Sequence, residues 1–102
     1  ADLTGEAQRI MDRIALTAMS PDSSITVTGH TDDVPISNGQ FRDNWDLGAG
    51  RAASVVQAIQ NTGLISGDRL SAVSKGEMAP VADNNTAAGR EQNRRIEIEI
   101  SY

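Results

Sequence analysis

The sequence predicts an α+β domain with a mixed sheet and two main helices packed on one face. Three observations lead to this class. Two stretches carry apolar residues at helical spacing, three stretches have the alternation of strands, and they follow one another as helix, strand, helix, strand, turn and strand. With 102 residues, 38% hydrophobic and 23% charged, the chain has the size and balance of a single folded domain over 1–102.

The first helix is expected from about Thr4 to Ala18, because apolar residues recur there at spacings of three and four. Thr4 is a suitable N-cap, and Pro21 stops the helix soon after its end. The first strand is expected from Ser24 to Gly29, where β-branched residues alternate between apolar and polar.

The second helix is expected from about Trp45 to Asn61, after a loop over 33–43 that contains proline, asparagine and glycine. Asn44 is the expected N-cap, and Gly63 lies just beyond the expected end.

A second strand is expected over 69–74. The succession of strand, helix and strand predicts a parallel pair joined by a right-handed crossover. One helical turn is expected near 86–91, followed by a last strand over 95–102 in which isoleucine alternates with polar residues. The long connection before this last strand leaves its direction open.

Arg51 is the residue that fits its surroundings least. It falls within the arc of an apolar stripe made by Leu47, Val55, Ala58 and Ile59. Asp32 follows the strand that leads into the same helix, at the position where βαβ units bind ligands. Three readings are open: the arginine snorkels to water, it forms a salt bridge with Asp32, or the two residues flank one pocket and hold the two charges of a zwitterion.

Two glycines early in the second helix, Gly48 and Gly50, weaken it relative to alanine. Either the fold tolerates them, or the helix backbone closely approaches a ligand or a neighbouring strand there.

Composition excludes several functions. The net charge of −5 and a single basic cluster, Arg90 to Arg95, are untypical of a nucleic-acid binder. That cluster is either a solvated run or supplies a carboxylate anchor to the pocket. Without cysteine there is no thiolate zinc site, and His30 with Asp32 and Asp33 matches no metal-ligand spacing. No catalytic set or phosphate loop is present, so the sequence predicts neither an enzyme nor a cofactor.

Five ordered blocks of residues carry a resemblance to a known family. They are Gly29-His30-Thr31-Asp32, Asn44-Trp45-Asp46-Leu47, Arg51-Ala52, Gly76 with Pro80, and Asn93-Arg94-Arg95-Ile96-Glu97-Ile98. Together they resemble the OmpA-like peptidoglycan-binding domain, a βαβαβ sandwich. The longer loop with Val34-Pro35-Ile36 is most similar to the periplasmic domain of flagellar stator B subunits, the MotB and PomB group.

The resemblance implies a non-catalytic, periplasmic domain that binds peptidoglycan through the diaminopimelate of the stem peptide. By position, Asp32 would take the ammonium group and Arg51 the carboxylate, helped by N–H groups at the start of the second helix. Further binding residues carried over in the same way are Thr31, Asn44, Leu47 and Arg95, the last favoured over Arg94.

The chain departs from the family pattern in two places. Gly48 stands where the family usually has serine, and the family's first strand is missing before the first helix. Ala1-Asp2-Leu3 is interpreted as the exit from that strand, so the chain is expected to be a truncated part of a longer, membrane-attached envelope protein. The alternative function is an interaction or dimerisation module with this fold that no longer binds the wall, and a second copy of the chain is left open as a partner.

Overall fold

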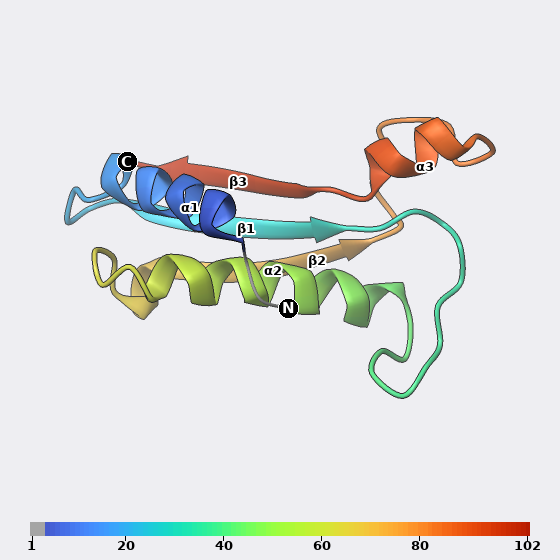
Figure 1. The fold of residues 1–102 in the computed structure, drawn as a ribbon, viewed down its shortest axis with the longest axis horizontal. Coiled ribbons are helices and arrows are strands. Elements are labelled where there is room, and N and C mark those ends of the chain that lie inside the picture. The colour runs from blue at the N-terminus through green and yellow to red at the C-terminus, as the bar shows by residue number, and fades with distance from the viewer. Residues whose placement is uncertain (1–3) are drawn as a thin grey trace.

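The computed structural model describes residues 4–102, which form a three-stranded mixed sheet with two helices against one face (Figure 1). The expectation for residues 1–3 lies outside the described part. The helices are α1 (Gly5–Thr17), α2 (Asn44–Gln60) and α3 (Ala87–Asn93), with a short 3-10 turn, η1 (Gly67–Arg69). The strands are β1 (Ser24–His30), β2 (Leu70–Gly76) and β3 (Ile96–Ser101). The predicted α+β class and the order of the elements are thus confirmed.

The N-terminal caps of the helices are partly as predicted. Thr4 caps α1, its hydroxyl accepting the N–H of Ala7 at 3.1 Å. The prediction for α2 was wrong by one residue, because Asp43 is the cap and its Oδ1 accepts the N–H of Asp46 at 2.9 Å. The Asn44 side chain is instead bonded to the loop that precedes the helix.

The sheet has the order β2-β1-β3, with β1 parallel to β2 and antiparallel to β3. The predicted parallel crossover is confirmed, and the direction that the sequence left open for β3 is antiparallel. The C-terminal ends of β1 and β2 and the N-terminal end of β3 therefore meet at one end of the sheet. In Figure 1 this is the end that carries α3 and the loop before α2.

The core lies between the sheet and the two long helices, α1 and α2. Its buried members come from both helices, from β1 and from the turn after α2; they are Met11, Ala15, Ala18, Ile25, Val27, Ala52, Ala58, Ile59 and Ile65. None of the helices within residues 4–102 is long and apolar enough to cross a membrane.

The predicted apolar stripe of α2 is confirmed at Ala58 and Ile59, which are buried in the core, and differs from the structure at the start of the helix. Gly48 and Ala52 are buried, whereas Leu47 and Arg51 are only half-buried at the margin. The reason is a close backbone contact: a Cβ on Gly48 would overlap the Ser74 hydroxyl and lie 3.0 Å from the carbonyl oxygen of Gly29. Of the two explanations for this glycine, close approach to a neighbouring strand is the one that the structure shows.

Candidate functional site

The end of β1 delivers Asp32 to the end of the sheet where the three strands meet. The backbone N–H of His30 donates to the carbonyl oxygen of Arg95 at 2.9 Å, and that of Thr31 donates to Gly76 at 2.9 Å. The buried Thr31 hydroxyl donates to the carbonyl oxygen of Asp32 at 2.8 Å. Thr31 therefore holds the backbone at Asp32 and is not among the residues that line the pocket in front of that carboxylate.

Asp32 is a nearly buried carboxylate, with 9% of the residue exposed. Its Oδ1 accepts the N–H of Val34 at 3.0 Å, and its Oδ2 lies 2.7 Å from Nη1 of Arg94. The Asn44 amide donates to the carbonyl oxygens of Asp32 (3.3 Å) and Val34 (3.1 Å) and contacts the Glu77 carboxylate at 3.4 Å. Asn44 thus fixes the loop that forms one wall of the site.

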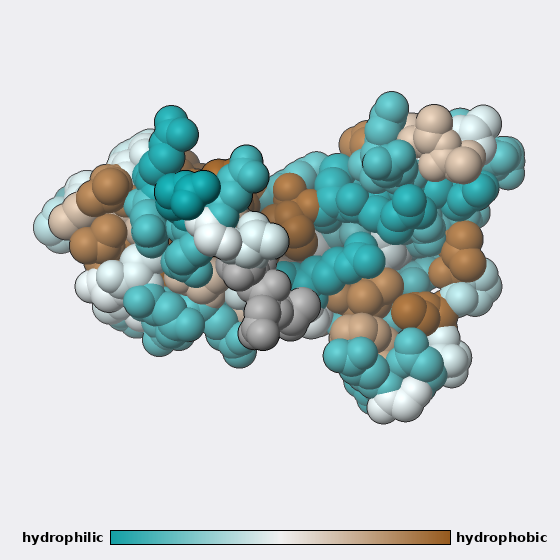
Figure 2. All heavy atoms as spheres, in the orientation of Figure 1, coloured by the Kyte–Doolittle hydropathy of each residue, from teal (hydrophilic) through white to brown (hydrophobic). Residues whose placement is uncertain are grey.

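A pocket of about 390 Å³ opens in front of Asp32, within the size range of small-ligand sites. It is lined by the loop after β1, the start of α2 and one face of α3, through Asp32, Val34, Pro35, Ile36, Asn44, Leu47, Arg90 and Arg94. Figure 2 shows polar side chains over α3 and a few apolar side chains between α3 and this loop. The loop over 33–43 is therefore a wall of the pocket.

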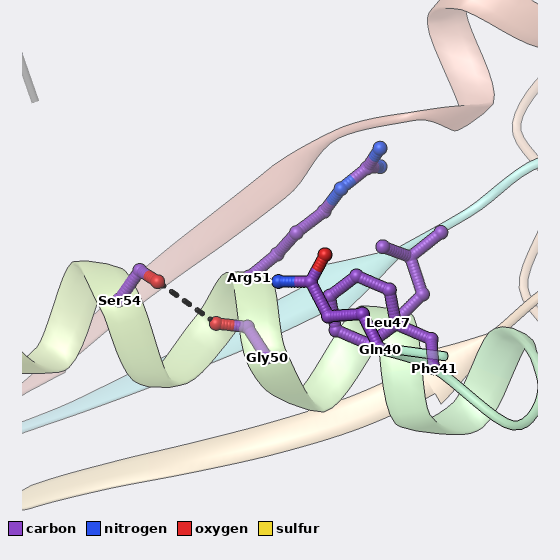
Figure 3. A pocket seen from close by; sticks show the side chains of 6 residues that line it. All are labelled: Gln40, Phe41, Leu47, Gly50, Arg51 and Ser54. Atoms are coloured by element: carbon purple, nitrogen blue, oxygen red, sulfur yellow. Dashed lines mark hydrogen bonds between the residues drawn. The ribbon is translucent and has the colours of Figure 1, made fainter. Parts of the chain in front are cut away.

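Arg51 lies in a neighbouring hollow of about 340 Å³ (Figure 3). The other residues of this hollow are Gln40, Phe41, Leu47, Gly50 and Ser54. Figure 3 shows the Arg51 side chain extending away from α2 on the same side as Leu47, which lines both hollows. Among the described residues Arg51 forms no ion pair, so the salt bridge between Arg51 and Asp32 is absent. The two residues line adjacent hollows, whereas the third reading of the sequence had them flank one pocket.

Arg94 and Arg95 point in different directions. Arg94 reaches Asp32, whereas Arg95 places Nε 2.8 Å from the Glu97 carboxylate and donates from Nη2 to the carbonyl oxygen of Ala79 at 3.0 Å. Successive side chains entering a strand alternate between its faces, so only one of the two can face the pocket. The structure brings Arg94 there and does not bring Arg95, which the sequence favoured.

Arg90 is the pocket residue to which the sequence gave no definite role. It lies one helical turn before Arg94, and both residues line the 390 Å³ pocket. The signal was present in the sequence, because a helical turn was expected near 86–91 and four residues separate the two arginines.

The start of α2 is occupied by its own carboxylates. Asp43 caps it, and Asp46 accepts from both the backbone N–H and the Nε of Arg42. The hydrogen bonds and charge of Arg42 lower the pKa of Asp46. A ligand carboxylate that bound to the N–H groups at the start of α2, as expected from the sequence, would therefore be repelled by the carboxylates of Asp43 and Asp46.

His30 is buried beside the sheet end, with Nε2 3.2 Å from the Glu97 carboxylate. The pKa of Glu97 is lowered, first by its hydrogen bond from Arg95 and then by the charge of Arg95. Within residues 4–102 no three metal-ligating side chains gather where they could hold an ion.

Comparison with known proteins places these features in a family. The model of the OmpA family matches residues 1–94. Motility protein B of Bacillus subtilis is 39% identical over 85 residues, which cover 83% of this chain and 33% of that protein. The peptidoglycan-binding protein ArfA of Mycobacterium tuberculosis is 33% identical over 102 residues, covering 99% of this chain and 30% of ArfA. The chain therefore spans about a third of the length of these relatives.

A solved structure supports the same assignment. The crystal structure of the C-terminal domain of Helicobacter pylori MotB superposes with a TM-score of 0.86 at 29% identity, covering 99% of this chain and 77% of that one. The similarity to MotB expected from the sequence is thus confirmed for both sequence and fold.

Proposed function

The chain belongs to the OmpA family, and from this premise we propose that it binds peptidoglycan without catalysis, through the diaminopimelate of the stem peptide. The observation that carries the proposal is Asp32, a nearly buried carboxylate at the base of an open pocket with arginines around it. The names of relatives support the ligand class, since ArfA is a peptidoglycan-binding protein.

The chemistry of diaminopimelate fits this arrangement. The free end of its side chain carries an ammonium and a carboxylate on the same carbon. Asp32 takes the ammonium, and Arg51, on the other side of Leu47, takes the carboxylate. Recognition by single charge pairs allows a chain of net charge −5 to bind an anionic polymer.

The remaining residues expected to bind the ligand shape the site around Asp32 and Arg51. Leu47 provides the apolar surface between the two charges, and Asn44 and Thr31 hold the backbone on either side of Asp32. Arg95 lies outside the pocket and supports the β3 end through Glu97 and Ala79. The whole protein would then be a longer, membrane-attached envelope protein that this periplasmic domain anchors to the cell wall.

Calorimetric titration with two synthetic tripeptides tests the proposal. One ends in meso-diaminopimelate, and the other ends in lysine, which keeps the ammonium and lacks the carboxylate. Asp32→Ala should weaken both peptides by about 10- to 150-fold, because a charged hydrogen bond contributes about 1.5–3 kcal/mol. Arg51→Ala should weaken only the diaminopimelate peptide and remove the preference over lysine.

The controls separate the alternatives. Arg13→Ala removes a cation from α1, at a different hollow, and should leave binding unchanged. If Arg94→Ala, and not Arg51→Ala, removes the preference, the carboxylate binds at Arg94. If neither peptide binds wild type and purified sacculi do not retain it, the chain is an interaction module and the proposed function is wrong.

A further inference from the structure

We propose that Arg90 forms a second carboxylate subsite. It binds a free carboxylate of the stem peptide that does not belong to diaminopimelate. This inference rests on the proposed function and adds a ligand group to the same pocket. It assigns to Arg90 the recognition of the acidic residue that precedes diaminopimelate. That residue continues the peptide through its γ-carboxyl group, so its α-carboxyl group is either free or amidated.

The first argument is position. Arg90 lies on α3, Arg94 is the residue that follows the helix, and both line the 390 Å³ pocket that contains Asp32. The segment is firmly held, because Thr86 caps it by accepting the N–H of Gly89 at 2.9 Å. At its other end, the Asn93 side chain is completely buried.

Asn93 also fixes the loop that approaches Arg90. Its Oδ1 accepts the N–H groups of Val81 (2.7 Å) and Ala82 (3.0 Å), and its amide donates to the carbonyl oxygen of Ala82 (3.0 Å) and to Oδ1 of Asn84 (2.7 Å). These bonds satisfy both ends of the amide and hold the loop over 81–84 against α3. The Arg90 side chain, which contacts this loop at Asn84, therefore has a defined position before any ligand binds.

The second argument is the state of the Arg90 guanidinium. Its Nη1 donates to the carbonyl oxygen of Asn84 at 2.9 Å, which orients the half-buried side chain. Among the described residues no carboxylate lies within ion-pair distance of it. A guanidinium has five N–H donors, and most of those of Arg90 are left for a ligand.

The third argument is charge. The ionised side chains that line the pocket are one carboxylate and two guanidinium groups, so the pocket is positive inside a chain of net charge −5. In the proposed function the diaminopimelate carboxylate binds at Arg51 in the neighbouring hollow, so only its ammonium enters this pocket and the positive excess remains. A further anionic group on the ligand offsets this excess. A planar carboxylate suits a guanidinium, which can donate two parallel hydrogen bonds to it.

The test compares two tripeptides that both end in meso-diaminopimelate. In one the preceding D-glutamate has a free α-carboxylate, and in the other this group is a carboxamide. Wild type should bind the free acid about tenfold more tightly, as expected for the loss of one charged hydrogen-bonded pair. Arg90→Gln should bind both peptides equally, with the affinity that wild type has for the amide. Arg13→Gln has the same change in net charge, lies on α1, and should keep the tenfold preference.

The outcomes are distinct. The subsite is refuted if wild type binds acid and amide equally, or if Arg90→Gln weakens both peptides by the same factor, which indicates a purely structural role. If Arg90→Gln does not fold, as judged by thermal unfolding, the preference of wild type decides alone, and Arg90→Lys should retain part of it. If wild type binds neither peptide, the proposed function fails and the subsite fails with it. Binding of both without discrimination removes only the subsite.

Discussion

Replacement of Gly29 by alanine is expected to force β1 and α2 apart. A Cβ on Gly29 would overlap the carbonyl oxygen of Gly48 and lie 2.8 Å from its carbonyl carbon and 3.1 Å from its Cα. All three atoms belong to the backbone of α2, so no change of side-chain rotamer relieves the clash. The helix must move away from the sheet, and the packing around the completely buried Val27 and Ala52 is loosened with it.

The size of the effect follows from the contact. Overpacking a core costs about 1–3 kcal/mol, and a clash that only backbone movement relieves belongs at the upper end, about 3 kcal/mol. For a domain of this size each kcal/mol lowers the Tm by about 4–8 °C, so the Tm should fall by about 12–24 °C. Thermal unfolding followed by circular dichroism measures this directly.

Gly39→Ala is the matched control. It lies in the loop before α2, a Cβ there meets nothing within 4 Å, and its φ is not positive. The same change of one methyl group should therefore shift stability by no more than about 1 kcal/mol, and in the stabilising direction. If Gly29→Ala unfolds within a few degrees of Gly39→Ala, the close contact of β1 and α2 does not constrain residue 29 and the reasoning is wrong.

Three further changes test other parts of the fold. Asp43→Ala removes the N-cap of α2 and should cost about 1 kcal/mol, measured by urea unfolding. Asn93→Ala removes the four hydrogen bonds of a completely buried side chain and should cost about 3 kcal/mol or more, with faster amide exchange in the loop over 81–84. The pKa of Glu97 is lowered in the fold, so its stabilisation is present above the ordinary pKa of glutamate, about 4.3, and is lost in more acidic solution. The free energy of unfolding, measured in urea, should therefore fall less steeply for Glu97→Gln than for wild type as the pH is lowered from about 5 to 3.

The sequence predicted the secondary structure well because the patterns were local. Isoleucine alternating with glutamate identified β3, and Thr4 followed by a helical apolar stripe identified α1. The N-cap of α2 was misplaced because Asp43 and Asn44 are both good capping residues by type. What decided between them was tertiary: the Asn44 amide bonds to loop carbonyl oxygens twelve and ten residues earlier in the chain.

The buried face at the start of α2 was misplaced for a different reason, whereas Ala58 and Ile59 were correctly assigned to the core. A stripe drawn through the most hydrophobic residues runs through Leu47 and places Arg51 in its centre. The helix instead buries two small residues, Gly48 and Ala52, because at Gly48 its backbone almost touches that of β1. A prediction based on hydrophobicity misses such buried positions, because a glycine has no apolar side chain and is buried there to let two backbones come close.

The sequence predicted the carboxylate of the pocket, Asp32, and only partly the arginines around it. Asp32 was found because it follows β1 at the edge where ligands bind to βαβ units. The choice between Arg94 and Arg95 depended on the residue at which β3 begins, and strand boundaries read from a single sequence are uncertain by more than one residue. In the structure α3 ends at Asn93, and Arg94, the first residue after the helix, is the arginine whose side chain reaches Asp32.

The pair of Asp32 and Arg94 has a consequence for how the proposed ligand binds. In the structure a cation already lies 2.7 Å from the carboxylate oxygen where the ligand ammonium would bind. Binding then exchanges one cation for another, so a nearly buried carboxylate is not left without a partner in either state. Arg94 is 41% exposed in its side chain and is free to swing when displaced. The exchange itself is the same for any ligand ammonium. A ligand that carries only an ammonium makes this exchange and leaves Arg51 without a carboxylate, which is a physical reason for the expected preference for diaminopimelate over lysine.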